Sequence, residues 1–481
     1  MSTLSSKDKK FYGVVAITLI IMIGFGYLPT FGQITPQGMR VLGIFLGCIF
    51  AWLFGELVWS SVIGLVLLGV FGFGTMTDNY ARAYGNNIGA IMLVSLIFCY
   101  AIEKSGLLTE LSRWIVSRKW AQKSPWSLVL AFNLAALISA TMLGTTIPVM
   151  ILLWALFYEI ANEIGIKPFD PLAVIVLCGV AVSSSVGNVI MPYTGTPTLV
   201  RGLAEASNPD FMFNTGEYIL LNFLVAAIFL VLFSLVLRLV FGRKIHIEMP
   251  QRESYKMKLN VESKISLVFF IIVILTLIVP QFLNADNIIR VFFNDKLTVV
   301  GIFMIISAIL MIIRINGKPL LDIPAALAGA PWPLFLLVTA ALTISDYLTT
   351  DEMGIVSTIV ASLNPLLAGR SAFEVTLIFI VIGLVMTNFI NDMVTIMVLF
   401  PIAAQFILDA NGSVMILAIL FSQVCIQGCL MPSGSITGAM MHGNNEWMTS
   451  KQVFTYVFIM EVVVLITIIS VAFLGKFIGI S

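Results

Sequence analysis

The stretch TNFINDMVTIMVLFP, residues 387–401, places one carboxylate and two amide side chains inside an apolar segment. Mostly hydrophobic residues flank these polar groups, at 378–385 and again at 396–399. A polar side chain in such surroundings needs a hydrogen-bond partner or a function. The apolar segment, residues 372–410, is therefore predicted to be interrupted at its middle.

The composition of the chain is typical of an integral membrane protein. Of its 481 residues, 59% are hydrophobic and 11% are charged, which is more apolar than a soluble domain can bury. Apolar runs of about 17 to 25 residues recur along the chain, each long enough to cross about 30 Å of hydrocarbon as a helix. Continuous runs of this kind predict helices and not a barrel.

Charge and cysteine content exclude several functional classes. The formal net charge of +1 provides no basic field for nucleic acid, so no nucleic-acid partner is expected. The five cysteines lie within apolar runs and are interpreted as small packing residues. Cys425 and Cys429 lie one helical turn apart, but neither of the two histidines completes a metal-ligand set with them. We find no Walker motif and no nucleophile with a matching base, and therefore predict that the chain is not an enzyme.

Hydropathy predicts eleven helices that cross the membrane. Their approximate positions are 12–29, 40–54, 58–74, 88–105, 171–206, 217–242, 263–280, 297–313, 331–345, 413–443 and 453–476.

Two further apolar stretches, 126–164 and 372–410, are interrupted by polar residues. The Lys and Arg clusters share the cytoplasmic face only if each interrupted stretch enters and leaves on one side. We therefore predict two re-entrant helical hairpins, the first opening inward and the second outward. A kinked helix followed by an amphipathic segment is the alternative for each. This topology places the N-terminus and the loop 243–262 in the cytoplasm and the C-terminus outside, in the plasma (inner) membrane.

An internal repeat supports the two hairpins. MPYTGT at 191–196 follows the first interrupted stretch, and MPSGS at 431–435 follows the second. Pro lacks an amide donor and Gly tolerates strained backbone, so each sequence predicts a helix that is unwound in mid-membrane. Hairpins of opposite orientation predict an inverted repeat, with residues 38–242 matching 263–481.

The helix breaks are the predicted binding region. Unwound backbone in lipid is costly unless it faces protein or a water-filled cavity, so paired breaks indicate a midplane site. The first hairpin turns at SATMLGTT, residues 139–146, and its partner is SSSVGNVIMPYTGTPT, residues 183–198. Helix N-termini there attract anions, whereas free carbonyls and hydroxyls suit a hard cation such as sodium.

These motifs resemble those of the divalent anion:sodium symporters of the ion transporter superfamily. That family has Ser-Asn-Thr at each hairpin tip, Gly-Thr-Pro-Pro-Asn in its fifth helix and Pro-Ser-Gly in its tenth. The matching tip positions are Ser139, Ala140 and Thr141, and Asn391, Asp392 and Met393, with Thr387, Phe389, Thr395 and Pro401 as matching flanks. The helix motifs match Gly195, Thr196, Pro197, Thr198 and Leu199, and Pro432, Ser433 and Gly434.

The resemblance implies an elevator-type homodimer in which a transport domain slides against a scaffold. The implied divisions are scaffold helices at 1–125 and 263–371, a cytoplasmic loop at 243–262, and transport-domain hairpins with broken helices at 126–242 and 372–481. It implies substrate contacts at Ser139, Thr141, Thr196, Pro197, Thr198, Asn391, Thr395, Ser433, Gly434, Ser435 and Thr437. It implies coupling-ion positions, where sodium is the possible metal, at Ser139, Gly144, Gly187, Asn188, Gly195, Asn388, Asp392 and Gly428.

Asp392 departs from the family pattern, because the resembling family has a neutral Asn there. An ionised Asp at the centre of a membrane helix costs about 2.5 to 3.5 kcal/mol, which a proton or a sodium ion relieves. We therefore predict a coupling-cation site at Asp392, with Asn388, Asn391 and the 433–435 hydroxyls as neighbours. A helix cap is the alternative.

Three other polar positions have two readings each. Arg201 and Glu205 lie one turn apart, and a solvated pair near the outer surface is favoured over an anion clamp. Glu461, in an apolar helix, is either functional or a structural partner of a neighbouring helix. His442 is expected at the surface, with proton relay as the alternative.

The function predicted from these features is secondary active transport of a small organic anion, a di- or tricarboxylate, coupled to sodium or protons. The alternative with the same fold is a cation/proton antiporter that exchanges ions at Asp392. No cofactor is expected beyond sodium as a coupling ion. The sequence does not distinguish which anion is carried, sodium from proton coupling, or symport from exchange.

Overall fold

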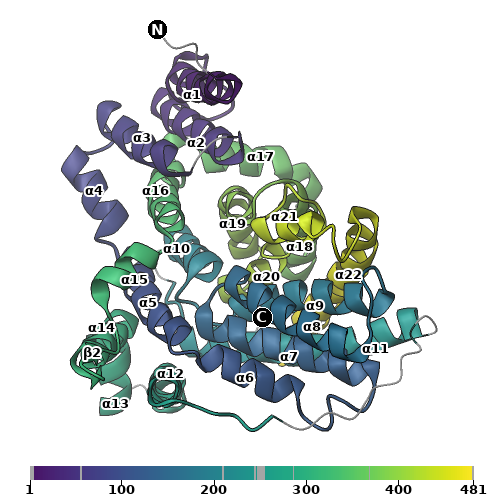
Figure 1. Ribbon diagram of the computed structural model, residues 1–481. Helices are drawn as coiled ribbons and strands as arrows, with labels where there is room; N and C mark the ends of the chain where they lie inside the picture. Colours follow the sequence, from purple (N-terminus) through teal and green to yellow (C-terminus); the bar gives the residue numbers. More distant parts are fainter. Residues whose placement is uncertain are drawn as a thin grey trace.

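The computed structural model describes residues 5–54, 57–208, 211–242, 245, 255–284, 286–367 and 369–478. This part of the chain is almost entirely helical (Figure 1). Most of the predicted cytoplasmic loop, 243–262, lies outside the described residues.

The first half contains helices α1 to α11. Their bounds are α1 Ser6–Gly24, α2 Pro36–Phe54, α3 Leu57–Val70, α4 Met76–Tyr84, α5 Asn87–Lys104, α6 Leu107–Val116, α7 Pro125–Leu143, α8 Ile147–Ile164, α9 Pro171–Asn188, α10 Gly195–Ser207 and α11 Thr215–Phe241. A short 3-10 helix, η1 Phe25–Tyr27, follows α1.

The second half contains α12 to α22. Their bounds are α12 Val261–Ile278, α13 Ile288–Val291, α14 Thr298–Ile312, α15 Ile323–Gly329, α16 Trp332–Leu348, α17 Ile355–Leu367, α18 Ala372–Phe389, α19 Asp392–Asp409, α20 Val414–Cys425, α21 Ile436–Gly443 and α22 Ser450–Ile478. Shorter elements are η3 Val279–Phe282, the π-helix η4 Phe292–Leu297, η5 Asp351–Met353, and a two-stranded antiparallel sheet of β1 Arg314–Ile315 and β2 Lys318–Pro319.

The predicted crossings are confirmed as helices. Within the described residues, twelve helices are long and apolar enough to cross a membrane, and four of them are α7, α8, α18 and α19. The other eight correspond to predicted crossings. Three further predicted crossings correspond to helices that are shorter or bent: α3, α16 and the broken pair α20–α21.

Four short helices were not among the predicted elements: α4, α6, α15 and α17. They have 7 to 13 residues, so a search for long apolar runs passes over them.

The first interrupted stretch forms a helical hairpin, as predicted. α7 and α8 contact each other and are joined by a turn at 144–146. Gly144 ends α7 with φ 61°, in the left-handed region where other residues are strained. At the start of α7, Ser124 forms a capping box and Pro125 occupies the first helical position.

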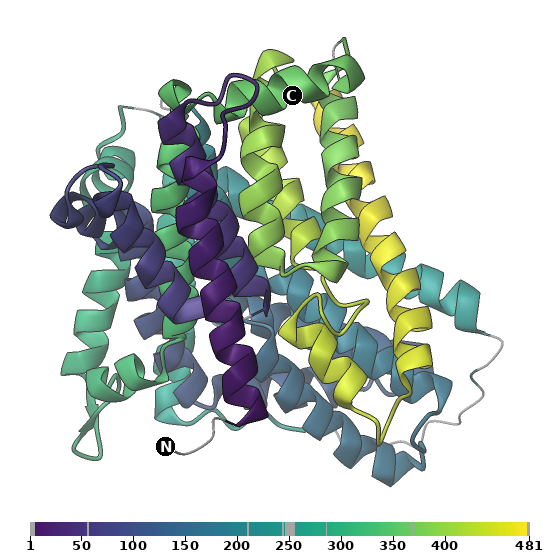
Figure 2. The same cartoon turned by 90° about the horizontal axis from the view of Figure 1, so that it is seen from above.

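The second interrupted stretch forms a matching hairpin. α18 and α19 pack along each other and are joined by Ile390 and Asn391, in the stretch that opened the sequence analysis. Figure 2 shows them as two green helices side by side, whose junction lies near the middle of the molecule. Ser371 forms the capping box that begins α18.

Each hairpin is followed by a broken helix and then a long helix. Residues 189–194 separate α9 from α10, and residues 426–435 separate α20 from α21, so both predicted breaks are confirmed. Five crossings (α9–α10, α11, α12, α14 and α16) separate the open end of the first hairpin from that of the second. An odd number of crossings places the two open ends on opposite sides, which is the predicted inverted repeat.

The buried centre of the molecule lies around α9. Every residue of α9 from Leu172 to Asn188 is buried, because α7, α8 and α22 pack around it (Figure 1). All five cysteines are buried, in agreement with their predicted packing role.

Candidate functional site

The tip of the first hairpin packs directly against the first helix break. The Thr194 hydroxyl donates a hydrogen bond to the Gly144 carbonyl at 3.1 Å, and the Thr141 hydroxyl donates to the Gly187 carbonyl at 3.2 Å. The Asn188 amide lies 3.5 Å from the Thr146 hydroxyl. The tip therefore lies at the depth of the break, which is midway along a crossing.

Two glycines allow this close approach. A Cβ atom on Gly144 would lie 1.9 Å from Thr194 Oγ1, and one on Gly187 would lie 2.3 Å from the Leu137 carbonyl oxygen. Neither distance is possible for a real side chain. These glycines therefore join hairpin and broken helix through their backbones.

Ser139 lies apart from these contacts. It is buried in α7, and its hydroxyl lies 3.3 Å from the Ser112 hydroxyl in α6. This contact directs Ser139 toward α6, and we leave it out of the substrate contacts proposed below.

The second hairpin tip packs against the second break in the same way. The Thr387 hydroxyl donates a hydrogen bond to the Cys425 carbonyl. Cβ atoms on Gly428 and Gly434 would lie 2.6 and 2.7 Å from the Thr387 carbonyl oxygen, so only glycine fits at either position. Ser435 begins α21 by accepting from the Gly438 amide and donates to the Gly428 carbonyl at 2.5 Å.

Asn388 joins this tip to the last helix. Its side-chain amide donates to Glu461 Oε2 in α22 at 2.8 Å, and its side-chain carbonyl accepts from the Leu430 amide at 2.8 Å. Glu461 is only 4% exposed. Asn388 therefore holds a buried carboxylate and the unwound backbone together.

Asn391 caps α19, and Asp392 lies beside it. Asn391 Oδ1 accepts from the Met393 amide at 3.0 Å, and Asp392 Oδ1 accepts from the same amide at 2.9 Å. Capping is therefore provided by Asn391 without the charge of Asp392. Within the described part of the chain, the second carboxylate oxygen of Asp392 makes no hydrogen bond.

The two half-sites meet where α10 and α19 begin. Thr196 Oγ1 lies 3.8 Å from Met393 Sδ, and a Cβ atom on Gly195 would lie 3.9 Å from Met393 Cε. Thr196 and Met393 are both second residues of their helices. Two helix N-termini, with their partial positive charge, therefore converge at one point.

A second bridge joins the broken helices. Gln423 in α20 donates to Asn222 Oδ1 in α11 at 2.8 Å and to the Val186 carbonyl in α9 at 3.4 Å. This bridge lies within buried helices and holds the last turns of α9 and α20 side by side.

Several buried polar atoms at the breaks have no hydrogen-bond partner among the described residues. They are Asn188 Oδ1, Thr198 Oγ1, Thr395 Oγ1, Gln427 Oε1 and Glu461 Oε1. Buried polar atoms are normally hydrogen-bonded. Amide, hydroxyl and carboxylate oxygens are ligands of hard cations, so this donor set fits sodium as a transported ion.

The remaining predicted residues lie close to these contacts but differ in exposure. Pro197 is buried in the first turn of α10, and Gly434 and Thr437 are buried at the second break. Ser433 is exposed.

Arg201 corrects one expectation from the sequence. It is 8% exposed and donates from Nε to Glu205 Oε1 at 2.9 Å, so the pair is not a solvated surface pair. The Phe213 ring, 5.0 Å from the guanidinium carbon, and the Thr215 hydroxyl cover it. Burial of this kind depends on residues distant in sequence.

Asn222 and Gln423 were not predicted from the sequence, and Met393 was matched to the hairpin-tip motif but not predicted as a site residue. Met393 carried no polar signal, because its sulfur contact depends on where α10 lies. Gln423 did carry one, since an amide within the apolar helix α20 indicates a function or a buried partner, as the carboxylate of Glu461 does in α22.

Comparisons with known proteins agree with this geometry. The family model described as citrate transporter matches residues 49–425, more than half of the chain. The sodium-dependent dicarboxylate transporter SdcS of Staphylococcus saprophyticus is 22% identical over 498 aligned positions, which cover 97% of this chain and 93% of that protein. The crystal structure of the YdaH transporter of Alcanivorax borkumensis superposes with a TM-score of 0.60 at 13% identity, covering 98% of both chains.

These findings confirm the resemblance to the divalent anion:sodium symporters and the all-helical transporter fold. The family is one of transporters and not of enzymes, in agreement with the sequence prediction. The chain therefore belongs to the citrate transporter family.

Proposed function

We propose that this protein moves a small organic anion, a di- or tricarboxylate, across the membrane by secondary active transport. The observation that carries this proposal is the meeting of the N-termini of α10 and α19 at the contact between Thr196 and Met393. Two helix N-termini aimed at one point favour a carboxylate. The citrate transporter family and the sodium-dependent dicarboxylate relative support the same substrate class.

We further propose that Asp392 carries the coupling cation, sodium or a proton. Asn391 caps α19, so the carboxylate of Asp392 is not needed for the cap. An uncompensated negative charge beside a bound carboxylate opposes substrate binding, and a cation removes this repulsion. A cation bound at Asp392 therefore favours binding of the anion, which is the requirement for coupling.

The proposed substrate contacts are Thr141, Thr196, Pro197, Thr198, Asn391, Thr395, Gly434, Ser435 and Thr437. The proposed coupling-ion positions are Gly144, Gly187, Asn188, Gly195, Asn388, Asp392 and Gly428. The backbone contacts of the glycines and the unpaired oxygens of Asn188, Thr198 and Thr395 support these two groups.

Uptake into proteoliposomes tests the function. Labelled succinate and citrate are offered to the purified protein under an inward sodium gradient and, separately, under an inward proton gradient. We expect one gradient to drive accumulation above the level reached without a gradient. If neither anion enters under either gradient and sodium exchanges for protons instead, the protein is a cation/proton antiporter.

We propose an elevator movement in which 126–242 and 372–481 form the transport domain and 1–125 and 263–371 form the scaffold. α10 and α16 belong to different domains in this division, and they pack closely: a Cβ atom on Gly202 would lie 2.6 Å from Leu342 Cδ2. The contact is apolar, so sliding there breaks no hydrogen bond between these two residues.

A disulfide across this contact tests the movement. The double variant Gly202→Cys with Leu342→Cys is oxidised in proteoliposomes, and each single variant treated in the same way is the control. We expect uptake to stop on cross-linking and to return with reductant. Uptake at the control rate by fully cross-linked protein would exclude sliding between α10 and α16.

We propose a homodimer in the plasma membrane, with the N-terminus cytoplasmic and the C-terminus outside. Lys123 and Lys167 flank the first hairpin, and α7 and α8 lie between them. Cysteines introduced at these two positions are expected to react only with a reagent added from the cytoplasm. Labelling of the two from opposite sides would contradict the re-entrant topology, and light scattering of the purified protein measures the oligomeric state.

A further inference from the structure

A cavity of about 590 Å³ lies between the two halves of the molecule, beyond the helix breaks. α5, α10 and the start of α11 line it from the first half, and α12, η3, α13, η4 and α14 line it from the second. Its polar lining includes Arg201, Glu205, Thr215, Gln281, Arg290 and Asn294. The volume is within the range of small-molecule sites, which span about 300 to 1,000 Å³.

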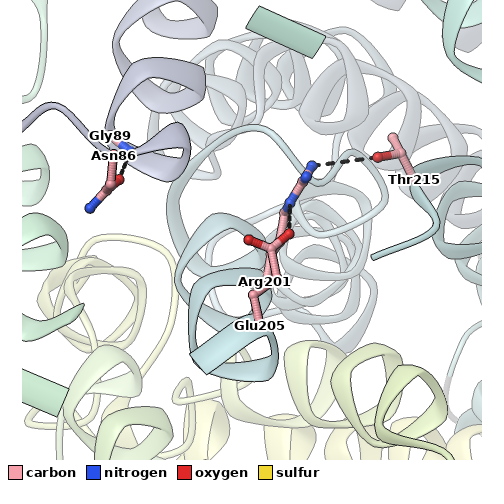
Figure 3. A network of polar contacts seen from close by, with 5 residues as sticks. All are labelled: Asn86, Gly89, Arg201, Glu205 and Thr215. Carbon is pink, nitrogen blue, oxygen red and sulfur yellow. Dashed lines mark hydrogen bonds and ion pairs between the residues drawn. The ribbon is translucent and has the colours of Figure 1, made fainter. Parts of the chain in front are cut away.

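Arg201 is held rigidly at this cavity. Figure 3 shows its guanidinium between Glu205 on the same helix and Thr215 at the start of α11. These contacts use Nε, at 2.9 Å from Glu205 Oε1, and Nη1, at 3.5 Å from Thr215 Oγ1. Within the described residues no acceptor contacts Nη2, so both of its N–H donors remain for a ligand.

Arg290 adds a second guanidinium from the opposite wall. It is half-buried, and its Nη1 donates to the Leu283 carbonyl at 2.9 Å. No carboxylate forms an ion pair with it among the described residues. Asp295 also lines the cavity but is exposed to solvent, which screens its charge.

The walls supply both polar and apolar contacts. Gln281 and Asn294 hydrogen-bond to each other at 3.3 Å, while Phe211, Phe213 and Phe293 contribute apolar surface. On the α5 side, Asn86 caps the helix by accepting from the Gly89 amide at 2.6 Å (Figure 3). This cap fixes the first turn of α5, where Asn87 lines the cavity.

We propose that this cavity is a second ligand site, which binds a small organic carboxylate between Arg201 and Arg290. Guanidinium groups bind carboxylates through charge-assisted hydrogen bonds, and the aromatic wall accommodates the carbon part of the ligand. The site is separate from the meeting point of α10 and α19, because Arg201 lies six residues beyond Gly195, or about 9 Å along the helix.

A bound carboxylate joins the two halves of the molecule. It contacts α10 and α11 through Arg201 and contacts α13 through Arg290, so occupation of the cavity stabilises this arrangement of the halves. The binding itself does not depend on which ion drives transport.

Ligand-dependent thermal stability of the full-length protein in detergent tests the site. Succinate and citrate are added as choline salts, and choline chloride of equal ionic strength is the reference. The same titrations are made on a double variant of the helix-break site, Thr196→Val with Thr395→Val. We expect the carboxylates to raise the melting temperature in both proteins, because the cavity is intact in both.

Variants of the cavity make the test specific. Arg290→Gln removes one charge-assisted bond and is expected to raise the half-saturating concentration about tenfold or more in the double-variant background. Asn294→Asp, which places a negative charge on the wall with little change in shape, is expected to act in the same direction and serves if Arg290→Gln does not fold. Arg314→Gln, an exposed residue of β1, is the matched control and should change nothing.

Three results would overturn the proposal. They are no carboxylate-specific rise in wild type, a rise that disappears in the helix-break variant, and a rise that is unchanged in both Arg290→Gln and Asn294→Asp. Each leaves the uptake assay unaffected, so failure of the second site is distinguishable from failure of the transport function.

Discussion

The two hairpin tips share one backbone design but differ in charge. In each half, a glycine of the broken helix packs so closely against the hairpin that a side chain would not fit there. Gly187 packs against Leu137 in the first half, and Gly428 packs against Thr387 in the second. The first tip presents the hydroxyls of Thr141 and Thr146 to its break. Two carboxylates are found at the second tip: Asp392 begins α19, and Glu461 of α22 accepts from Asn388. The repeated backbone therefore builds the frame, and the unrepeated charges are the candidates for ion coupling.

The halves also differ in exposure. Thr194, Thr196 and Thr198 at the first break are at most 1% exposed. Asn391 and Asp392 at the second tip are half-buried, and Ser433 is exposed. These residues of the second half-site are therefore less buried than the threonines of the first break in this arrangement of the molecule.

The largest expected effect comes from the shared frame. Gly187→Val and Gly428→Val each force a side chain against a backbone carbonyl that cannot move aside, and each is expected to cost about 3 kcal/mol or more of stability. Gly443→Val is the control, since no atom lies within 4 Å of a Cβ there. Thermal melts and size-exclusion profiles measure the loss. If one of these two variants were as stable as wild type and the other were not, the backbone contacts of the two halves would not be equivalent.

The next largest effect is expected at the hydrogen bond between Asn388 and Glu461 in the second half. The Asn388 amide nitrogen donates both to the Leu384 carbonyl and to Glu461. Glu461→Leu removes the second of these acceptors and is expected to cost about 1 to 2 kcal/mol, whereas Glu461→Gln keeps an acceptor and should cost less. Thr467→Val is the control on the same helix, because among the described residues its hydroxyl bonds only to the Val463 carbonyl of its own helix. Equal melting temperatures for Leu and Gln would show that the Asn388 contact contributes nothing.

A smaller, symmetric effect is expected for the proposed substrate hydroxyls. Thr196→Val and Thr395→Val keep side-chain shape and remove one hydroxyl from each half-site. We expect each to raise the KM for uptake about tenfold, the loss of one hydrogen bond to a charged ligand, with unchanged melting temperature. An unchanged KM in both would remove the meeting point of α10 and α19 from the substrate site.

The smallest effect is expected at Ser139. Its hydroxyl contacts Ser112 and not the break, so Ser139→Ala should change uptake less than twofold and stability by about 0.5 to 1 kcal/mol. A KM change as large as that of Thr196→Val would return Ser139 to the substrate site.

The positions of the helix breaks were predictable from the local properties of proline. Pro192 and Pro432 cannot continue a hydrogen-bonded helix, and both lie in breaks where the sequence predicted them. Lateral contacts were not predictable, because periodicity identifies a helix but not its neighbour. The hydrogen bond between Asn388 and Glu461, which lies 73 residues further along the chain, was therefore not predicted. The burial of Arg201 was not predicted either, because the residues that cover it, Phe213 and Thr215, lie outside its own helix.

The charge difference between the halves leads to the central claim, that Asp392 carries the coupling cation. Asp392→Asn keeps an oxygen beside the Met393 amide, leaves the Asn391 cap in place and removes the charge. Asp409→Asn is the control, because it removes a carboxylate from the exposed far end of the same helix, away from the hairpin tip.

The decisive measurement is the initial rate of succinate and citrate uptake by Asp392→Asn in proteoliposomes, as a function of sodium concentration and of pH. We predict that stimulation by the ion that drives the wild-type protein is lost or changed, while the Asp409→Asn control retains it. Uptake by Asp392→Asn with the wild-type sodium and pH dependence would contradict the claim and leave Asp392 as an auxiliary cap of α19.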